Sequence, residues 1–369
     1  MNGIVRQYDN GMNPASTVAR APTPALVIDE TVLDANIARM ADFTARAGLS
    51  LRPHVKTHKS IEIARRQLAA GAVGITVATL SEALIFSEAG CTDIFVAYPL
   101  WLDETKAEML GRVLVHSSVL VGVDSLEGAV QIAGTGLGQT GRLTVLIEID
   151  SGHHRSGVLP DEAGVLARAV RDAGLEVTGV FTFPGHSYSP ATRQSAAQDE
   201  HRALSVAVAS LADQGIDAHV VSGGSTPSLE FTEPSVLTEV RPGVYVFGDA
   251  QQWELETIEP GTIALTAIAT VVSRSPGHLI LDAGSKVLGA DRGAYSTGYG
   301  RLLDYPDARI SALSEHHATV TGVALERGAR VRVVPNHSCA AVNLADEYLV
   351  ASPDGSARWW PVNARGRNR

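Results

Sequence analysis

Short apolar runs rich in β-branched residues alternate, along the first two-thirds of the chain, with longer stretches whose apolar residues recur at helical spacing. The runs predict strands at Ala25–Asp29, Leu51–Val55, Gly74–Thr79, Asp93–Tyr98, Leu120–Asp124, Leu143–Asp150, Glu176–Phe183, His219–Ser222 and Val240–Phe247. The intervening Ala- and Leu-rich segments, such as Ser81–Ala89, Ala163–Ala173 and Ala197–Ala212, predict helices. Repeated alternation of this kind is typical of a parallel sheet covered by helices.

The length of the alternating region favours a closed barrel. A (β/α)8 barrel needs roughly 200–250 residues, and residues 22–250 supply them. We therefore predict an α/β protein whose residues 22–250 form a (β/α)8 barrel. A doubly wound open sheet is the alternative, but no GxGxxG follows the first strand, which disfavours its dinucleotide-binding version.

The pattern changes near Trp253, and the following apolar runs lack long helical segments between them. They predict strands at Ile263–Val272, His278–Asp282, Ala318–Ala324, Arg330–Val334 and Glu347–Ala351. We expect residues 251–369 to form a second, all-β domain, which residues 1–21 complete.

Composition narrows the function classes. The 369 residues carry a formal charge of −10 and no basic run, which argues against a nucleic-acid partner. No apolar stretch approaches the roughly 18 residues of a membrane span, and the N-terminus lacks the apolar core of a signal peptide. The cysteines, Cys91 and Cys339, are too few for a disulfide scaffold. We expect a cytoplasmic enzyme with a small-molecule substrate.

Polar residues follow the second predicted strand, in the segment Arg52-Pro53-His54-Val55-Lys56-Thr57-His58-Lys59. In a β/α barrel, functional groups cluster at the carboxyl ends of the strands. Most lysines lie on solvated surfaces, but partial burial and neighbouring positive charge would give Lys56 the free amine that a Schiff base requires.

A glycine-rich turn with two hydroxyls, Ser222-Gly223-Gly224-Ser225-Thr226, follows a late strand. Backbone N–H groups in such a turn can hold a phosphate, and Gly243 offers a second close approach. A tight connection before a helix is an equally good explanation of the turn alone. Together, a barrel lysine and a phosphate loop point to pyridoxal 5′-phosphate.

His337 and Cys339 are candidate metal ligands. Two residues apart on an extended segment, their side chains would point to the same side and form half of a Zn²⁺ shell. A buried histidine beside a small core cysteine is the commoner outcome. No second His/Cys pair accompanies them, so a bound ion would keep open positions, as a catalytic metal needs.

Several of these motifs, in this order, resemble the fold-type III pyridoxal-phosphate enzymes of the D-threonine aldolase/D-serine dehydratase family. The resemblance rests on residues 52–59, Ser81-Glu82-Ala83, the Gly-Gly-Ser-Thr turn, Arg241-Pro242-Gly243-x-Tyr245, Asp282-Ala283-Gly284-x-Lys286 and Pro335-x-His337-x-Cys339. It implies an alanine-racemase-like barrel with a C-terminal β-domain and a homodimer.

The resemblance also implies roles for individual residues. Lys56 would carry the Schiff base, with His54 and Arg155 as further catalytic candidates. Arg155 would lie near the cofactor ring, and Tyr188 would contact the cofactor. The phosphate would be held by Ser225, Thr226, Gly243 and the N–H of Val244. His337 and Cys339 would bind a divalent metal, Zn²⁺ or else Mn²⁺ or Co²⁺.

The family's reactions on β-hydroxy-D-amino acids leave alternatives. His-x-Cys and the Gly185–Tyr188 segment follow the dehydratase pattern, which favours conversion of a D-serine-like or 3-hydroxyaspartate-like substrate to a 2-oxo acid and ammonia. Aldolase cleavage to glycine and an aldehyde, and metal-independent racemisation, are the alternatives. Phe181 and Phe183 depart from the family, which often has a tyrosine facing the pyridine nitrogen and a histidine at these positions.

Overall fold

The computed structural model describes residues 21–369, which divide into two compact units. The barrel unit comprises residues 39–56, 63–243 and 367–369, and the β unit comprises residues 21–38, 57–62 and 244–366. The domain boundaries at 22–250 and 251–369 stay a prediction. Apart from Ala21, the expected contribution of residues 1–21 lies outside the described residues.

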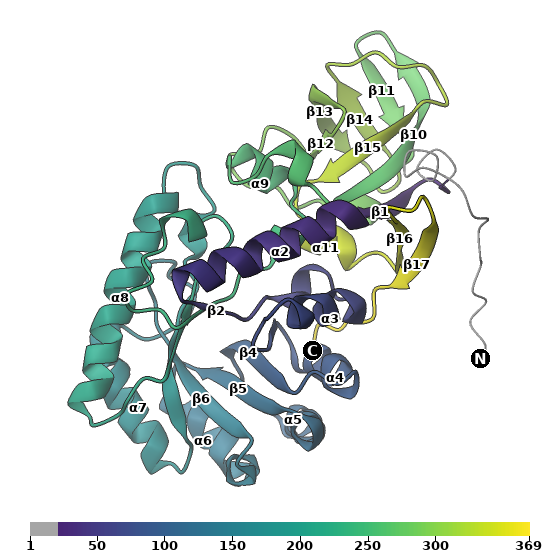
Figure 1. Ribbon diagram of the computed structural model, residues 1–369. Helices are drawn as coiled ribbons and strands as arrows, with labels where there is room; N and C mark the ends of the chain where they lie inside the picture. The colour runs from purple at the N-terminus through teal and green to yellow at the C-terminus, as the bar shows by residue number, and fades with distance from the viewer. Residues whose placement is uncertain (1–20) are drawn as a thin grey trace. The chain divides into compact units, whose positions relative to one another are not determined.

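A curled, all-parallel sheet of eight strands forms the centre of the barrel unit as described (Figure 1). Its strands are β2 (Ser50–Leu51), β3 (Ile75–Val77), β4 (Asp93–Pro99), β5 (Ser118–Val123), β6 (Leu143–Glu148), β7 (Val177–Phe181), β8 (Val220–Gly223) and β9 (Glu239–Val240). The spatial order is β2-β9-β8-β7-β6-β5-β4-β3, and a parallel bridge between His54 and Thr76 joins its two ends. The sheet therefore closes into the predicted barrel.

Helices follow the barrel strands and lie outside the sheet (Figure 1). They are α3 (Ile61–Ala69), α4 (Leu80–Glu88), α5 (Glu104–His116), α6 (Leu126–Gly134), α7 (Ala163–Asp172) and α8 (Arg193–Asp213), while α2 (Glu30–Ala47) is divided between the units. Side-chain caps begin three of them: Thr79, Asp103 and Ser125 each accept the N–H of the residue three positions on. None of the described helices has both the length and the apolar composition of a membrane span.

In the β unit, strands form a mostly antiparallel nine-stranded sheet among the described residues. They are β1 (Ala25–Asp29), β10 (Leu265–Ser275), β11 (His278–Leu281), β12 (Gly300–Leu302), β13 (Tyr305–Leu313), β14 (Ala318–Thr321), β15 (Arg330–Pro335), β16 (Glu347–Ala351) and β17 (Ala357–Pro361). Pairing of β11 with both β14 and β10 closes six of them into a barrel, and β1, β16 and β17 extend it. Three short helices, α9 (Ala250–Glu254), α10 (Ser285–Leu288) and α11 (Ser338–Val342), complete the unit.

Most predicted strands are confirmed, with one reassignment. The run Ala25–Asp29 was assigned to the parallel barrel, but β1 pairs antiparallel with β10 and parallel with β16. Its apolar pattern fits either sheet, and only the partner strands decide between them. Two predicted runs are strands only in part. The run Leu51–Val55 is extended only as far as Leu51 and continues as a 3-10 turn at Val55–Thr57, and the run Val240–Phe247 leaves the sheet after Val240 and forms a 3-10 turn at Val244–Val246. The strands β12, β13 and β17 were missed.

We predict that Gly164→Ala destabilises the barrel unit. Gly164 lies where α7 packs on α8, and a Cβ there would lie 1.9 Å from the Ser210 carbonyl oxygen. The helices must move apart, at a cost of about 1–3 kcal/mol. Gly134→Ala in α6, where a Cβ meets nothing within 4 Å, is the matched control and should be neutral or slightly stabilising. Thermal unfolding of both variants decides, and equal melting temperatures would contradict the packing argument.

Candidate active site

A cavity of about 610 Å³ opens in the barrel unit. Its polar lining comes from His54, Lys56, Thr79, Tyr98, Asp124, Arg155, Ser156 and Arg241, and its apolar lining from Ala78, Ala97, Pro99, Phe183 and Gly224. These residues lie at or just beyond the ends of several barrel strands. The volume falls in the range of pockets that bind small molecules.

Lys56 reaches this cavity from the 3-10 turn that follows β2. Its side chain is exposed, so the partial burial expected from sequence is wrong for this structure. His54 is half-buried beside it, and its backbone N–H donates to the Pro242 carbonyl at 3.1 Å. The bridge that closes the barrel thus also fixes the backbone that carries both side chains.

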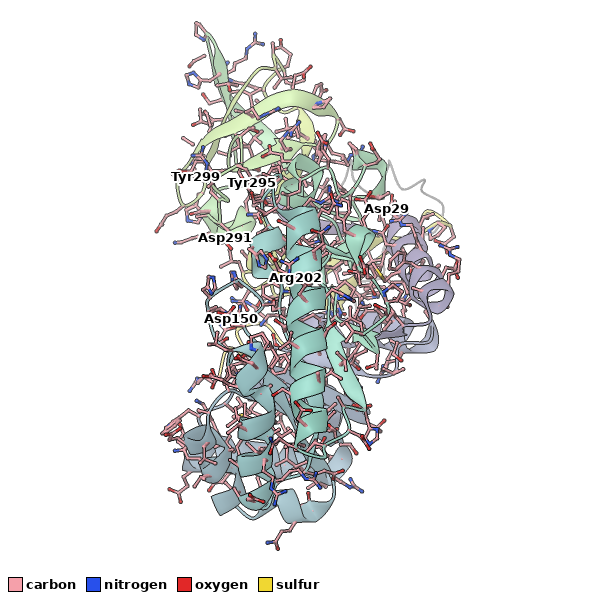
Figure 2. All side chains as sticks on the ribbon, turned by 90° about the vertical axis from the view of Figure 1, so that its left-hand side faces the viewer. Asp29, Asp150, Arg202, Asp291, Tyr295 and Tyr299 are labelled. Atoms are coloured by element: carbon pink, nitrogen blue, oxygen red, sulfur yellow. The ribbon has the colours of Figure 1, made fainter. Side chains whose placement is uncertain are left out.

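Arg155 extends from the loop that follows β6. Asp150, labelled in Figure 2, shapes this loop by accepting the N–H groups of Gly152 and His154 at 2.9 and 3.0 Å. The Arg155 guanidinium lies 5.2 Å from the centre of the Phe183 ring and 4.0 Å from Glu148 Oε1. It therefore stacks on an apolar wall of the cavity while it faces a buried carboxyl group.

Glu148 ends β6 and is almost fully buried. Burial raises the pKa of its carboxyl group, and the Ser156 hydroxyl, donating at 2.9 Å, together with Arg155 works against that rise. Its Oε2 has no hydrogen-bond partner within residues 21–369. A buried acceptor of this kind is costly unless something else satisfies it.

Arg241 supplies a second cation to the cavity. Its guanidinium lies 5.3 and 5.5 Å from the ring centres of Phe95 and Phe181, and it donates to the Thr182 carbonyl at 2.6 Å and to the Ser222 hydroxyl. Burial lowers its pKa to about 10, although the negative charge of Glu239 acts to raise it, so the group stays charged at neutral pH. Phe181 itself does not line the cavity, because its ring tip packs at Gly122, where a Cβ would lie 2.6 Å away.

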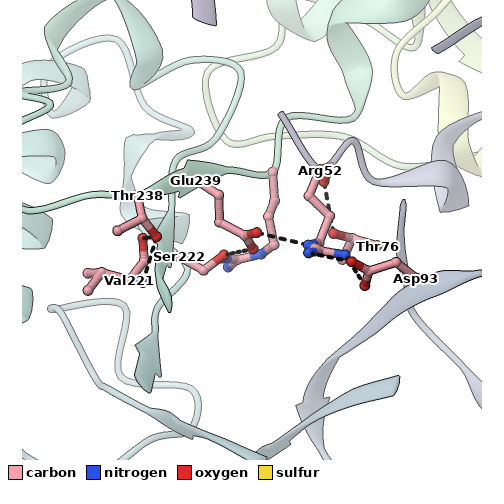
Figure 3. Close-up of polar contacts among 8 residues, drawn as sticks. Arg52, Thr76, Asp93, Val221, Ser222, Thr238 and Glu239 are labelled. Atoms are coloured by element: carbon pink, nitrogen blue, oxygen red, sulfur yellow. Dashed lines mark hydrogen bonds and ion pairs between the residues drawn. The ribbon is translucent and has the colours of Figure 1, made fainter. Parts of the chain in front are cut away.

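A chain of polar contacts links Ser222, Glu239 and Arg52 in the barrel unit (Figure 3), and Arg241 joins it by donating to Ser222. Glu239 on β9 accepts the Ser222 hydroxyl at 2.5 Å with one oxygen and Arg52 Nε at 2.9 Å with the other. Arg52 also donates to Asp93 at 2.6 Å. Glu239 thus shares its charge between two buried arginines, one directly and one through Ser222.

The glycine turn after β8 is built differently from the expected phosphate cradle. The Gly224 N–H donates to Glu200 Oε1 at 2.8 Å, and the Ser225 N–H donates to Ser228 Oγ at 3.1 Å, so these two amides are already used. The Ser225 hydroxyl contacts Ser187 Oγ at 2.9 Å. Thr226 Oγ1, in contrast, is buried and has no partner in the described part of the chain, and neither Ser225 nor Thr226 lines the cavity.

Three further cofactor candidates lie at these strand ends but do not line the cavity. Gly243 is half-buried after β9, and Val244 is buried at the start of the 3-10 turn Val244–Val246. Tyr188 is half-buried, and its ring centre lies 6.3 Å from that of Phe183.

His337 and Cys339 belong to the β unit and are not on an extended segment, which corrects the geometric argument from sequence. β15 ends at Pro335, His337 precedes α11, and Cys339 lies in its first turn. Electrostatic interaction with Cys339 is the main cause that raises the pKa of His337, and a hydrogen bond between the two side chains adds to it, so the two side chains do face each other. Cys339 Sγ also lies 3.3 Å from Thr57 Oγ1, in the residue directly after Lys56.

Asp249 orients His337. This fully buried carboxylate accepts the N–H groups of Gln252 at 2.8 Å and Ser338 at 3.2 Å, and its Oδ2 lies 3.4 Å from His337 Nδ1. A carboxylate behind a histidine commonly orients a metal ligand. No group of three or more His, Cys, Asp or Glu side chains within residues 21–369 is placed to hold a metal, so the pair would bind one with open positions.

The cavity brings together three of the predicted residues, His54, Lys56 and Arg155, and adds Thr79, Tyr98, Asp124 and Ser156, which were missed. A signal for them exists in the sequence. Thr79 and Asp124 follow β3 and β5 within two residues, and Tyr98 lies near the end of β4. Applying the strand-end rule to every strand would have found these three, whereas Ser156 lies eight residues beyond the end of β6.

Comparison with known proteins shows two matching family models. That for the N-terminal domain of alanine racemase covers residues 28–251, and that for a putative serine dehydratase domain covers residues 264–351. D-threo-3-hydroxyaspartate dehydratase of Delftia sp. (strain HT23) is 36% identical over 372 residues, which cover 93% of this chain and 98% of the dehydratase. D-threonine aldolase of Arthrobacter sp. is 33% identical over 376 residues, which cover 96% of each chain.

A solved structure agrees with these matches. It is the metal-free form of a cysteine-to-alanine variant of D-threo-3-hydroxyaspartate dehydratase, and it superimposes with a TM-score of 0.86 at 34% identity. The superposition covers 93% of this chain and 98% of that one.

We predict that Glu239→Gln costs about 3 kcal/mol of folding free energy, because it removes the charge that compensates Arg52 and Arg241 inside the barrel. Glu88→Gln, which breaks the exposed ion pair with Arg112, is the matched control and should cost less than about 1 kcal/mol. Chemical denaturation of the two variants gives the comparison. Equal small losses would show that Glu239 does not carry the buried network.

Proposed function

The chain belongs to the alanine-racemase-like family of pyridoxal-phosphate-dependent lyases that includes D-threo-3-hydroxyaspartate dehydratase and D-threonine aldolase. On this premise we propose that it converts a β-hydroxy-D-amino acid to a 2-oxo acid and ammonia. The observation that carries the proposal is the exposed Lys56 amine in a cavity of about 610 Å³ that also holds Arg155 and Arg241. A primary amine beside two cations suits an aldehyde that carries a phosphate and a substrate that carries a carboxylate.

The barrel residues fit pyridoxal 5′-phosphate. Lys56 would hold it covalently, and the unpartnered Thr226 hydroxyl, with Ser225, Gly243 and the N–H of Val244, would hold its phosphate. Arg155 and Tyr188 would contact its ring. When bound, the cofactor supplies the electron sink that makes the α-proton of the substrate acidic. We keep residues 22–250 as the proposed cofactor domain.

The donor set in the β unit fits a divalent metal. His337 offers a nitrogen and Cys339 a sulfur, which favours Zn²⁺, with Mn²⁺ or Co²⁺ as alternatives. The metal-free variant structure of the dehydratase implies that this relative binds a metal. An ion at this pair would act as a Lewis acid on the β-hydroxyl group of the substrate. We therefore assign the metal site to the proposed domain 251–369.

The chain's own residues would carry the protons. Lys56, once released from the cofactor, would take the α-proton on Nζ, and half-buried His54 would exchange protons with it. Arg155 would orient the substrate through its charge. Loss of the α-proton and the β-hydroxyl removes one water from the substrate, and uptake of one water releases ammonia. The products are therefore a 2-oxo acid and ammonia.

Aldolase cleavage is the second candidate, because the Arthrobacter D-threonine aldolase matches along nearly the whole chain. It would give glycine and an aldehyde from the same substrates. Racemisation on this fold would need no metal. Two further proposals rest on composition and family: a homodimer without nucleic-acid or membrane partners, and a cytoplasmic location.

We predict that D-threo-3-hydroxyaspartate, D-serine or D-threonine, incubated with the enzyme, pyridoxal 5′-phosphate and Zn²⁺, yields a 2-oxo acid and ammonia in equal amounts. A chelator should abolish turnover, and Cys339→Ala should do the same without loss of the cofactor absorbance. Glycine and an aldehyde would instead establish the aldolase. Racemised substrate with activity that survives chelation would establish the racemase.

We predict that Lys56→Ala abolishes covalent cofactor attachment. Borohydride reduction of the wild-type holoenzyme should fix the cofactor on the peptide that contains Lys56, as peptide mass spectrometry would show. Lys106→Ala, at a half-buried lysine in α5 of the same unit, is the control and should keep both the attachment and the absorbance. An unchanged absorbance in Lys56→Ala would assign the attachment to another lysine.

A further inference from the structure

Glu200 is a buried acid behind the glycine turn that the proposed mechanism does not use. It lies on α8 and is only 1% exposed. Its Oε1 accepts the Gly224 N–H at 2.8 Å, and its Oε2 is buried with no hydrogen-bond partner among the described residues. The carboxyl group also packs directly on the turn, since a Cβ at Gly223 would lie 2.5 Å from Oε1.

The turn itself depends on this contact. Gly224 has φ +75°, a left-handed conformation that favours glycine, and it lines the cavity. A Cβ there would also lie 3.0 Å from Val240 Cγ1, so the backbone lies close to β9. Glu200 accepts the Gly224 N–H, which therefore points to the carboxyl group, and two residues on, the buried Thr226 hydroxyl has no hydrogen-bond partner among residues 21–369.

Among the described residues, Arg241 is the cation that compensates the charge of Glu200. Arg241, after β9, acts on it electrostatically, but the same guanidinium also faces Glu239 and Glu148. Burial raises the pKa of Glu200 to about 7, and the Gly224 N–H and Arg241 oppose that rise. The carboxyl group is therefore able to gain or lose its proton near neutral pH. Because one of its buried oxygens has no partner within residues 21–369, the ionised form costs more free energy than the protonated form.

We propose that Glu200 is a positioning residue for the phosphate ester of the cofactor: its carboxyl group shapes the Gly223–Thr226 turn and, by keeping or losing its proton, sets how tightly the turn holds a doubly charged anion. This inference rests on the proposed cofactor site. A bound dianion raises the pKa of a neighbouring carboxyl group further, so binding takes up a proton. The contribution of Glu200 to the affinity for the dianion is then complete at acid pH, where the carboxyl group is protonated. It is lost as the pH rises through the pKa of Glu200.

The test uses pyridoxine 5′-phosphate, which carries an alcohol in place of the aldehyde and so binds without reaction at Lys56. Its dissociation constant is measured by calorimetry from about pH 6 to about pH 8.5 for the wild type and Glu200→Gln. The glutamine keeps an acceptor for the Gly224 N–H and never ionises. The titration of the phosphate itself is common to both proteins and cancels in the ratio of their constants.

We expect the two proteins to bind within about threefold of each other near pH 6, and the wild type to bind on the order of tenfold more weakly than Glu200→Gln near pH 8.5, since one pKa unit corresponds to tenfold. The phosphorus NMR shift of the bound ester should show an additional titration in the wild type alone. Glu200→Ala, which loses the acceptor, should bind more weakly at every pH. Glu127→Gln, an exposed glutamate on α6, should follow the wild type throughout.

The outcomes separate the two proposals. A ratio that does not change with pH would overturn the role of the Glu200 proton, and wild-type affinity in a folded Glu200→Ala protein, checked by its melting temperature, would overturn its role in shaping the turn. No binding of the ester by the wild type would overturn the proposed cofactor site and this inference with it. If the ester binds and the ratio of the two dissociation constants does not change with pH, the proposed cofactor site is retained and only the role of Glu200 is rejected.

Discussion

The barrel unit depends on one buried carboxylate placed between two buried arginines. Glu239 balances Arg52 directly (Figure 3) and Arg241 through Ser222, and all three side chains are buried. Ions buried to this extent are tolerated only when their charges and hydrogen bonds are matched. Because Glu239 lies on β9 and Arg52 follows β2, their ion pair also joins two neighbouring strands of the closed sheet. Closure of the barrel and placement of a charged group at the cavity are therefore one structural requirement.

The same requirement fixes the position of Arg241 in the lining of the cavity. Arg241 cannot move toward a ligand without losing its hydrogen bonds to Thr182 and Ser222, and its guanidinium lies over the rings of Phe95 and Phe181. Phe181 closes this packing with its ring tip at Gly122, so the position is used for packing within the barrel wall. The cation that an anionic ligand would meet is thus preorganised, which lowers the cost of binding.

Sequence reasoning was reliable where the signal is local. Alternating apolar runs located the barrel strands, and polar residues at strand ends located His54, Lys56 and Arg155, because the carboxyl ends of parallel strands meet at one edge. It failed where the outcome depends on a distant partner. The sheet that takes Ala25–Asp29 is decided by β10 and β16, and the amides of the glycine turn are decided by Glu200 and Ser228. The pairing of His337 with Cys339 was expected for the wrong reason, since a strand-to-helix turn brings the side chains together instead of an extended segment.

The buried glutamates of the barrel unit differ in how many of their carboxylate oxygens have hydrogen-bond partners. This difference distinguishes a glutamate that stabilises the fold from those that suit a role at the site. Glu239 uses both of its oxygens on fixed partners, and its charge is permanently required. Within residues 21–369, Glu148 and Glu200 each leave one buried oxygen without a partner, and burial raises the pKa of both carboxyl groups. A protein has no structural reason to keep two such costly groups beside one cavity, since an amide or an apolar side chain would fill the same space. Groups that can change their charge beside a ligand are instead what a site that binds anions and moves protons requires.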